Sequence, residues 1–190
     1  MSYLFDCYAP LYDRFMAVFH LNDTHALESL LPVPPARVLD VGGGTGALAQ
    51  RLHEKGYRVT VLDCSRPMLQ QAKRRCPELN TLCRPLEENP GYPGFDIVLC
   101  RDCLHHLGPT APALDRLLSW LAPGGSLFVH DFHPDNPAVK LLFLYERSCL
   151  EQITPVPCST LIRLSSRAEY RCRIRYTTGR DYICQISSPR

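Results

Sequence analysis

The stretch Arg37-Val38-Leu39-Asp40-Val41-Gly42-Gly43-Gly44-Thr45-Gly46-Ala47-Leu48-Ala49 decides the fold. An apolar run ends in a carboxylate, and a glycine cluster and a helix-forming segment follow it. This order predicts a buried strand, a tight turn and the start of a helix. Glycines adopt backbone angles closed to other residues and leave no Cβ in the way of a ligand. The free amides at the helix start favour a nucleotide-like cofactor, although a purely structural turn is the alternative.

The glycine spacing fits two kinds of cofactor loop. Gly42, Gly44 and Ala47 satisfy the G-x-G-x-x-G/A pattern of dinucleotide-binding proteins. Gly42, Gly44 and Gly46 equally satisfy the G-x-G-x-G pattern found in proteins that bind S-adenosylmethionine (SAM). Asp40 separates the two, because a carboxylate would repel a pyrophosphate but suits an ammonium and a sulfonium. We therefore favour SAM as the cofactor.

Length and charge limit the classes of protein that the chain can represent. Its 190 residues suffice for the core of one domain, and a net charge of +2 gives no reason to expect nucleic acid or a membrane as partner. No apolar run approaches the roughly 20 residues of a membrane-spanning helix. Asp6 stands where a signal peptide would carry basic residues, so we expect a cytoplasmic protein.

The cysteines are numerous, ten in all, but they are dispersed along the chain. Without a secretion signal we expect free thiols rather than a disulfide framework. Cys100 and Cys103, followed by His105 and His106, have a spacing that could hold a metal. However, Cys100 closes a predicted strand and there is no second cysteine pair. The sequence therefore predicts no metal ligands.

Strands and helices alternate outward from the glycine stretch. Further strands are predicted at 58–62, 79–83, 95–100 and 126–130. Helices are predicted at 47–55, from the turn containing Pro67 to Arg75, and at 109–121. A Pro-Gly-Gly turn at 123–125 should lead into the fifth strand. The alternation predicts an α/β fold with a doubly wound, mostly parallel sheet.

The two ends of the chain depart from this alternation. Residues 3–31 predict one or two amphipathic helices broken at Pro10, with Tyr12 as part of a lid. Residues 138–150 predict an apolar helix that covers a substrate pocket or packs against another subunit. Residues 170–176 and 181–186 predict a hairpin with three arginines on one face. We interpret these arginines as protection of a sheet edge, with an acidic partner as the alternative.

Polar residues follow the predicted strands at their carboxyl ends, where ligands of such sheets bind. They are Asp40, Asp63, Arg101-Asp102 and His130-Asp131. Asp63 lies where related folds place an acid on the ribose, and its two oxygens match the two donors of a vicinal diol. A helix-capping role is the alternative for Asp63, although Ser65 fits that role better.

Four motifs in order resemble those of class I SAM-dependent methyltransferases. They are Val38 to Gly46, Val61 to Leu69, Phe95 to Val98 leading to Leu104-His105-His106-Leu107, and Leu121 to Leu127. Tyr8-Ala9-Pro10-Leu11-Tyr12-Asp13 is similar to the N-terminal segment of the ubiquinone/menaquinone-biosynthesis subgroup. The resemblance covers the chain from about Tyr8 to Ile186.

This resemblance implies a Rossmann-like, seven-stranded sheet whose C-terminal strands form an antiparallel hairpin. It implies that the residues holding SAM are Asp40, Gly42, Gly43, Gly44, Gly46, Asp63, Cys64, Met68, Leu86, Arg101, His106 and Tyr12. Asp63 would bind the ribose, and Cys64 and Met68 would lie near the adenine. The family usually has an acid after the third strand, where this chain has Arg84-Pro85-Leu86, so the adenine contacts depart from the pattern.

The function expected is in-line transfer of a methyl group from SAM to a small-molecule acceptor. For an acceptor that carries a proton, His133, Asp131 and His105 are the candidate catalytic residues. We expect no nucleic-acid or membrane partner, and a monomer or homodimer. The chain is predicted to be one domain, with a lid at 1–35, a SAM-binding core at 36–134 and a substrate-side region at 135–190. The first alternative is a non-catalytic SAM-binding partner or regulatory subunit. The second, which we favour less, is an NAD-dependent oxidoreductase.

Overall fold

The computed structural model describes residues 9, 12–18, 23–86, 88, 94–149 and 151–188. Seven strands form a sheet with the order β3-β2-β1-β4-β5-β7-β6. This order and its antiparallel last strands confirm the predicted fold class. The chain divides into two compact units, residues 1–90 and 91–190, and each unit is described by itself below. The predicted organisation as one domain stays a prediction.

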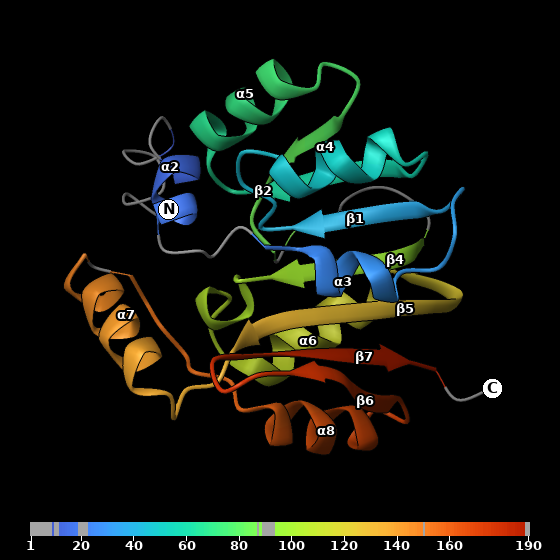
Figure 1. Cartoon of the computed structure of the whole chain (residues 1–190). Coiled ribbons are helices and arrows are strands. Elements are labelled where there is room, and N and C mark those ends of the chain that lie inside the picture. Colours follow the sequence, from blue (N-terminus) through green and yellow to red (C-terminus); the bar gives the residue numbers. More distant parts are fainter. Residues whose placement is uncertain are drawn as a thin grey trace. The chain divides into compact units, whose positions relative to one another are not determined.

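Among its described residues, the first unit has three parallel strands and the helices α2 to α5, which Figure 1 labels. In chain order they are α2 (Tyr12–Val18), α3 (His25–Leu30), β1 (Arg37–Val41), α4 (Ala47–Glu54), β2 (Arg58–Asp63), α5 (Arg66–Arg75) and β3 (Asn80–Cys83). Strand β2 lies between β1 and β3. Helix α4 packs on β2, and α5 packs on β2 and β3.

Local sequence signals set the helix boundaries of this unit. The Ser65 side chain accepts a hydrogen bond from the Met68 amide, and a proline stands in the first turn, so α5 begins as predicted. Helix α4 ends just before Gly56, whose φ of +96° favours glycine. The break predicted at Pro10 lies outside the described residues.

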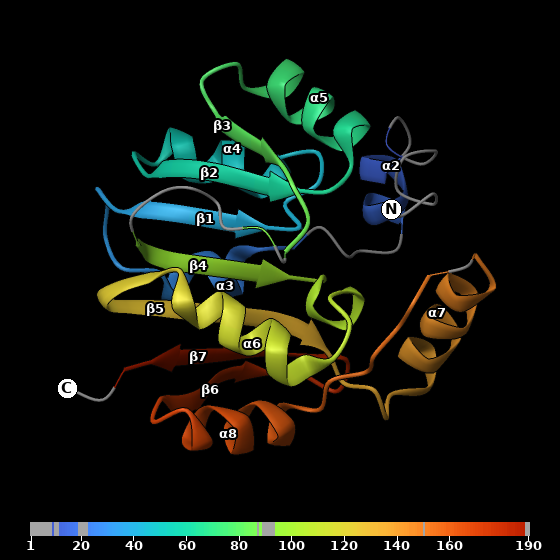
Figure 2. The ribbon, with the colours of Figure 1, turned by 180° about the vertical axis from the view of Figure 1, so that it is seen from behind.

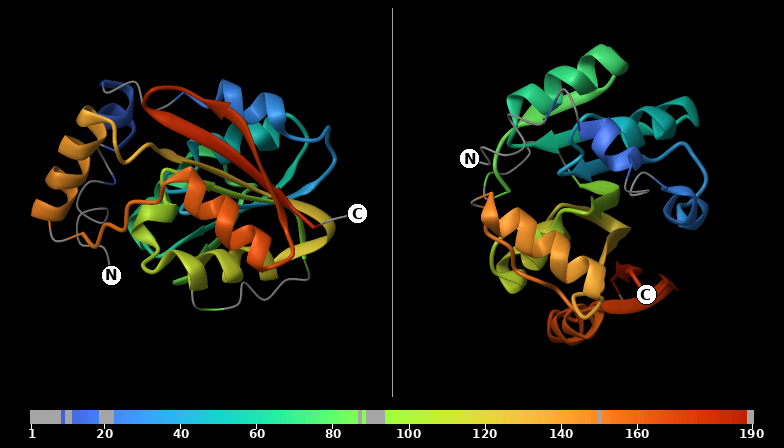
Figure 3. Two further views of the ribbon diagram at one scale, coloured as in Figure 1. Left: turned by 90° about the horizontal axis from the view of Figure 1, so that it is seen from below. Right: turned by 60° about the vertical axis from the view of Figure 1, so that its left-hand side comes forward.

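The second unit contains the other four strands. In chain order its elements are β4 (Phe95–Arg101), the 3-10 helix η1 (Leu104–His106), α6 (Thr110–Ser119), β5 (Leu121–Phe132), α7 (Pro137–Ser148), α8 (Cys158–Arg167), β6 (Arg171–Thr177) and β7 (Asp181–Ser187). Strand β5 pairs with β4 in parallel and with β7 antiparallel, and β7 pairs with β6. Figure 2 shows α6 in front of β5, and Figure 3 shows α8 alongside the hairpin of β6 and β7.

Two features of this unit differ from the prediction. The fifth strand begins at Leu121, because the expected Pro-Gly-Gly turn lies within β5 as an irregularity. Phe95 pairs with Leu121 and Ile97 with Ser126, so β5 carries three extra residues between these pairs. Gly125 packs so tightly that an added Cβ would lie 2.8 Å from the Phe95 carbonyl oxygen. Helix α8 was not predicted at all.

The core of each unit is apolar. The fully buried side chains include Leu39, Leu52 and Leu62 in the first unit and Leu99, Phe128 and Tyr182 in the second. Within the described ranges, every helix falls short of the length and apolarity that crossing a bilayer requires.

Candidate cofactor site and a buried histidine cluster

The glycine loop between β1 and α4 requires its glycines for two different reasons. Gly42, Gly44 and Gly46 have φ angles of +65°, +54° and +72°, in the left-handed region that only glycine adopts readily. Gly43 is limited by space instead, since an added Cβ would lie 2.7 Å from Asp40 Oδ2 and 2.8 Å from Val61 Cγ1. Asp40 is 2% exposed, so this carboxylate lies buried against the loop.

Asp63, at the end of β2, joins the loop to the start of α5. Its Oδ2 accepts a hydrogen bond from the Gly44 amide at 2.9 Å, and its Oδ1 accepts one from the Ser65 amide at 2.8 Å. A carboxylate offers about four lone-pair positions, so both oxygens retain acceptor capacity. Asp63 can therefore accept further hydrogen bonds, and its ribose-binding role stays a prediction.

Helix α2 is held against the same loop by three polar side chains. Thr45 Oγ1 donates a hydrogen bond to Asp13 Oδ1 at 2.6 Å, and Arg75 forms an ion pair with Asp13. Arg75 Nε also donates to the Thr45 carbonyl oxygen at 3.0 Å. The three nearest atoms to an added Cβ on Gly44 would be side-chain atoms of Met68 and Tyr12, both at 3.9 Å, and the Gly42 carbonyl oxygen at 4.0 Å. Met68 and Tyr12 thus border the loop at Gly44 without crowding it.

The residues expected near the adenine differ in their burial. Cys64 is exposed, and its carbonyl oxygen lies 3.7 Å from the Cys83 thiol. Met68 is buried, whereas Leu86 is half-buried. Glu87 lies outside the described residues. The adenine contacts of Cys64, Met68 and Leu86 stay predictions.

The second unit brings His105 and Asp131 together in its interior. His105 Nδ1 lies 2.7 Å from Asp131 Oδ1, and both side chains are almost fully buried. Asp131 also accepts hydrogen bonds from the backbone amides of His105 and Phe132. An ionised carboxylate only accepts, so His105 Nδ1 carries the shared proton. Burial alone would lower the pKa of His105, but the carboxylates of Asp131, Glu146 and Asp102 together outweigh burial and raise it.

Glu146 on α7 is an unpredicted member of this cluster. Its carboxylate lies 3.9 Å from His105 Nε2 and 3.8 Å from His106 Nε2. His106 Nδ1 lies 3.8 Å from Glu151. Burial raises the pKa of Glu146 to about 7 and lowers the pKa of His106 to about 3. We call His105, His106 and Glu146 the histidine cluster.

The remaining predicted residues of this unit have separate partners. His133 Nε2 lies 2.8 Å from Thr177 Oγ1, and its ring centroid is 5.2 Å from that of Tyr182, so it contacts the C-terminal hairpin. Arg101 pairs with Asp102 at 3.1 Å. The structure therefore joins Asp131 to His105 but connects His133 to β6 and β7. The catalytic roles of all three stay predictions.

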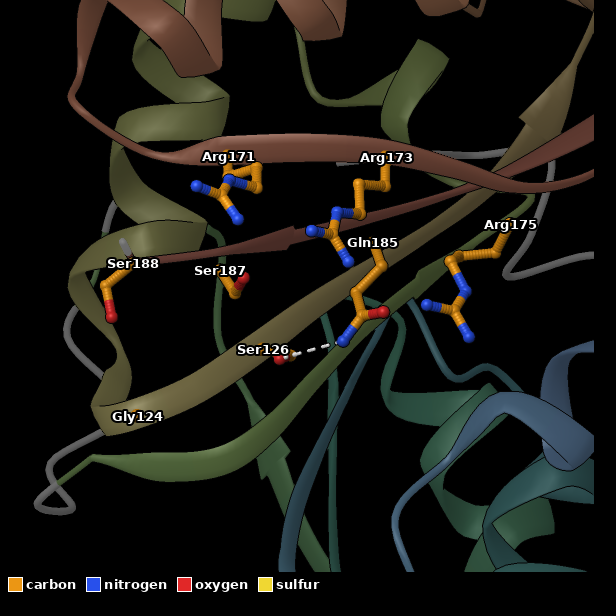
Figure 4. Close-up of a pocket in the computed structure, with 8 residues that line it drawn as sticks. All are labelled: Gly124, Ser126, Arg171, Arg173, Arg175, Gln185, Ser187 and Ser188. Carbon is orange, nitrogen blue, oxygen red and sulfur yellow. Dashed lines mark hydrogen bonds between the residues drawn. The ribbon is translucent and has the colours of Figure 1, made fainter. Parts of the chain in front are cut away.

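A polar hollow of about 750 Å³ lies on the face of the C-terminal strands (Figure 4). It is lined by Gly124, Ser126, Arg171, Arg173, Arg175, Gln185, Ser187 and Ser188. The three arginines project from one face of β6, as their alternation in the sequence predicts, with Gln185 and the serines beside them. We call this surface the arginine face.

Sequence reasoning missed Thr45, Arg75 and Glu146. Thr45 and Arg75 carry no motif signal, because their roles depend on contacts with Asp13 across 32 and 62 residues of chain. Glu146 does carry one signal: it follows the buried Val139 and Phe143 by seven and three residues, which places it on the inward face of α7.

The comparisons with known proteins agree with this arrangement. Residues 38–125 match a family described as a methyltransferase domain. The chain is 33% identical over 142 residues to a demethylmenaquinone methyltransferase of Renibacterium salmoninarum, covering 69% of this chain and 58% of that protein. It is 33% identical over 159 residues to a protein of the same name from Tropheryma whipplei, covering 79% and 66%. Over the first of these relatives the match thus spans little more than half of the relative's length.

A solved structure from Thermotoga maritima, titled a possible histamine N-methyltransferase, shares the fold. Its TM-score is 0.80 at 19% identity, with full coverage of both chains. The sheet order defines a Rossmann-like α/β fold with a glycine loop after its first strand. The sequence matches identify its family: the chain belongs to the class I SAM-dependent methyltransferases.

Proposed function

We propose that the protein is an enzyme that transfers a methyl group from SAM to a small-molecule acceptor. The observation that carries this proposal is the joining of the glycine loop to Asp63, whose carboxylate binds the Gly44 amide. That contact sets a carboxylate beside a loop bordered by Met68 and Tyr12. The family of the chain supports the same cofactor.

The residues of the first unit fit SAM. The glycines leave the loop backbone without side chains, and Asp63 retains acceptor capacity for two hydroxyl donors. In this proposal Asp40 supports the loop from its buried side, and Tyr12 covers a ligand above Gly44. Cys64, Met68 and Leu86 would contact the adenine, and Arg101 and His106 stay proposed cofactor contacts. When bound, SAM supplies a methyl group on a positively charged sulfur.

The second unit supplies the groups proposed to handle a proton of the acceptor. Asp131 orients His105 through a 2.7 Å hydrogen bond, the arrangement by which a carboxylate fixes the tautomer of a histidine base. His133 is the second proposed base. Positioning of the acceptor supplies most of the rate in such a displacement, on the order of 7–11 kcal/mol.

A small-molecule acceptor is favoured by the names of similar proteins. Two relatives are named for demethylmenaquinone and one neighbour of similar fold for histamine, and both are small molecules. These names refer to those proteins. For this chain we propose only the class of acceptor, a small molecule, and not the atom that receives the methyl group.

Binding of the cofactor is tested first, by calorimetry with S-adenosylhomocysteine and with NADH. We expect binding of the nucleoside and no binding of NADH. Asp63→Ala should weaken binding at least tenfold, because the mutant loses the proposed ribose acceptor. Asp115→Ala, a substitution at an exposed position on α6, is the matched control. Equal affinity of wild type and Asp63→Ala would remove Asp63 from the site.

Catalysis is tested separately with SAM carrying a labelled methyl group and a metabolite extract. We expect a labelled small molecule that mass spectrometry identifies. Binding of SAM without any labelled product across varied extracts would favour the alternative, a non-catalytic SAM-binding partner. Binding of NADH in place of the nucleoside would favour an oxidoreductase.

A further inference from the structure

The histidine cluster has the composition of a metal site. One ring nitrogen of His105, one of His106 and a carboxylate oxygen of Glu146 lie within 4.8 Å of one another. The two imidazoles come from η1 and the carboxylate from α7, so elements far apart in sequence converge there. Two His and one Glu form the ligand set of well-known zinc enzymes.

The far nitrogens of both rings face carboxylates. His105 Nδ1 is bonded to Asp131 at 2.7 Å, and His106 Nδ1 lies 3.8 Å from Glu151. Metal-binding histidines almost always donate their other ring N–H to a carboxylate, a carbonyl or water, which fixes the tautomer and aims the free nitrogen. The hydrogen bond to Asp131 holds the His105 ring in this way, and the Nε2 atoms of His105 and His106 lie 3.9 and 3.8 Å from oxygens of Glu146.

Two atoms of the cluster are buried in an unfavourable way unless a cation joins them. His105 Nε2 and Glu146 Oε2 have no hydrogen-bond partner among the described residues. His105 is 1% exposed, and the rings of Phe143 and Phe132 lie 5.0 and 5.9 Å from its own ring. Leaving buried polar atoms without a partner in apolar surroundings costs free energy. A divalent cation between them would satisfy both atoms.

We propose that His105 Nε2, His106 Nε2 and the Glu146 carboxylate bind one Zn²⁺ ion. Tetrahedral Zn²⁺ with bonds of about 2.0–2.1 Å needs ligand atoms about 3.3 Å apart. His105 Nε2 lies 3.9 Å from Glu146 Oε2, His106 Nε2 lies 3.8 Å from Glu146 Oε1, and one ligand atom of each residue lies within 4.8 Å of the others. Side-chain rotations would bring these atoms to the tetrahedral spacing. Two imidazoles exclude Mg²⁺ and Ca²⁺, which prefer oxygen ligands.

This site goes beyond methyl transfer, and cation binding can be measured without the cofactor. Three protein ligands leave the fourth position of Zn²⁺ open for an oxygen of water or of an acceptor. A bound ion occupies His105 Nε2, so His105 would then be a ligand rather than a base. The two roles exclude each other, and the metal measurement distinguishes them.

The test uses the untagged full chain, stripped of metal with a chelator and dialysed. We expect one equivalent of Zn²⁺ by calorimetry and, with Co²⁺, the visible absorption bands of a tetrahedral complex. Glu146→Gln and His106→Gln should each weaken Zn²⁺ binding at least about 100-fold. Loss of a residue that only hydrogen-bonds to a metal-binding side chain typically weakens binding roughly 10–100-fold. Circular dichroism of both variants shows whether they fold. One folded variant is enough to test the loss of Zn²⁺ binding.

A matched control separates this site from another set of ligand atoms. His53, Cys76 and Glu78 also lie within 4.8 Å of one another, but Glu78 is exposed. We expect His53→Gln to bind Zn²⁺ like the wild type. The proposal is overturned when the wild type binds no Zn²⁺ or Co²⁺, or when His53→Gln loses the ion that Glu146→Gln retains.

Discussion

Each position of the glycine loop requires glycine for its own structural reason. Gly42, Gly44 and Gly46 are fixed by backbone conformation, whereas Gly43 is fixed by the carboxylate of Asp40 and the side chain of Val61. Asp63 then binds the Gly44 amide from the next strand. The loop is therefore specified by contacts on both of its sides.

Gly43→Ala tests the demand for space. The new methyl group would lie within 2.9 Å of Asp40 and Val61, which two paired strands hold in place. We expect a loss of about 1–3 kcal/mol in the free energy of unfolding, as for other overpacked sites, measured by urea denaturation. Gly179→Ala is the control, because an added Cβ there meets nothing within 4 Å. Equal stability of the two variants would show that the loop yields easily.

The residues predictable from sequence are those with local signals. Asp63 follows a strand at a known distance from the glycines, and Ser65 stands three residues before the Met68 amide that it caps. Glu146 was not predicted, because its importance comes from η1, about 40 residues earlier in the chain. The spacing of His105 and Asp131 likewise gave no indication that they share a hydrogen bond.

Among the secondary elements, α3 and α4 are joined by one carboxylate. Glu28 on α3 accepts hydrogen bonds from Arg51 Nε at 2.9 Å and from Lys55 Nζ at 2.5 Å. Burial alone would raise the pKa of Glu28, but the bonds from Lys55, Thr24 and Arg51 outweigh it and lower the pKa to about 2. A lowered pKa means that folding favours the ionised form.

The pH dependence of stability follows from this pair of helices. The contribution of Glu28 is complete above its ordinary pKa of 4.5 and is lost as pH falls toward about 2. We expect Glu28→Gln to remove about 1 kcal/mol of unfolding free energy at pH 7 and less near pH 2, since partly exposed ion pairs are screened. Denaturation at several pH values measures this difference. Glu54→Gln, on a residue that accepts a hydrogen bond from Gln50 on its own helix, should show no such dependence.

The arginines of the arginine face lie on the edge strand β6. Sheet edges offer unpaired backbone groups to other chains, and charged side chains discourage that pairing. We expect Arg171→Ser, Arg173→Ser and Arg175→Ser together to increase aggregation, measured by light scattering at low salt. Arg163→Ser, Arg167→Ser and Arg116→Ser, on exposed helix positions, make the charge-matched control. Equal scattering of both triple variants would assign the effect to net charge alone.

The elements were predictable where hydrophobic periodicity is strong. Strands β1, β2 and β4 are buried apolar runs, and all three were located to within a residue. The predicted start of β5 was wrong. A Pro-Gly-Gly sequence indicates a turn, but here tertiary contacts keep it inside the strand. Helix α8 was missed, since only Leu161 and Ser165 of its ten residues are buried and its apolar pattern is short.

For the whole molecule, cofactor binding predicts a change in thermal stability. A ligand present at 100 times its dissociation constant adds about 2.7 kcal/mol to the free energy of unfolding. For a chain of this size that corresponds to a rise in Tm of roughly 5–11 °C. We expect S-adenosylhomocysteine to raise the Tm of the wild type in a thermal-shift assay, and NADH to leave it unchanged. A rise of the same size in Asp63→Ala would contradict the proposed ribose contact.

The attachment of α2 has a consequence for the timing of a reaction cycle. Asp13, Thr45 and Arg75 fasten this helix beside Gly44, with Tyr12 next to the loop. If the proposed site is correct, a spent nucleoside covered by α2 would depart only after those polar links open. Departure of the by-product, rather than chemistry, would then govern turnover, and loosening a threonine remote from the acceptor would make successive cycles faster.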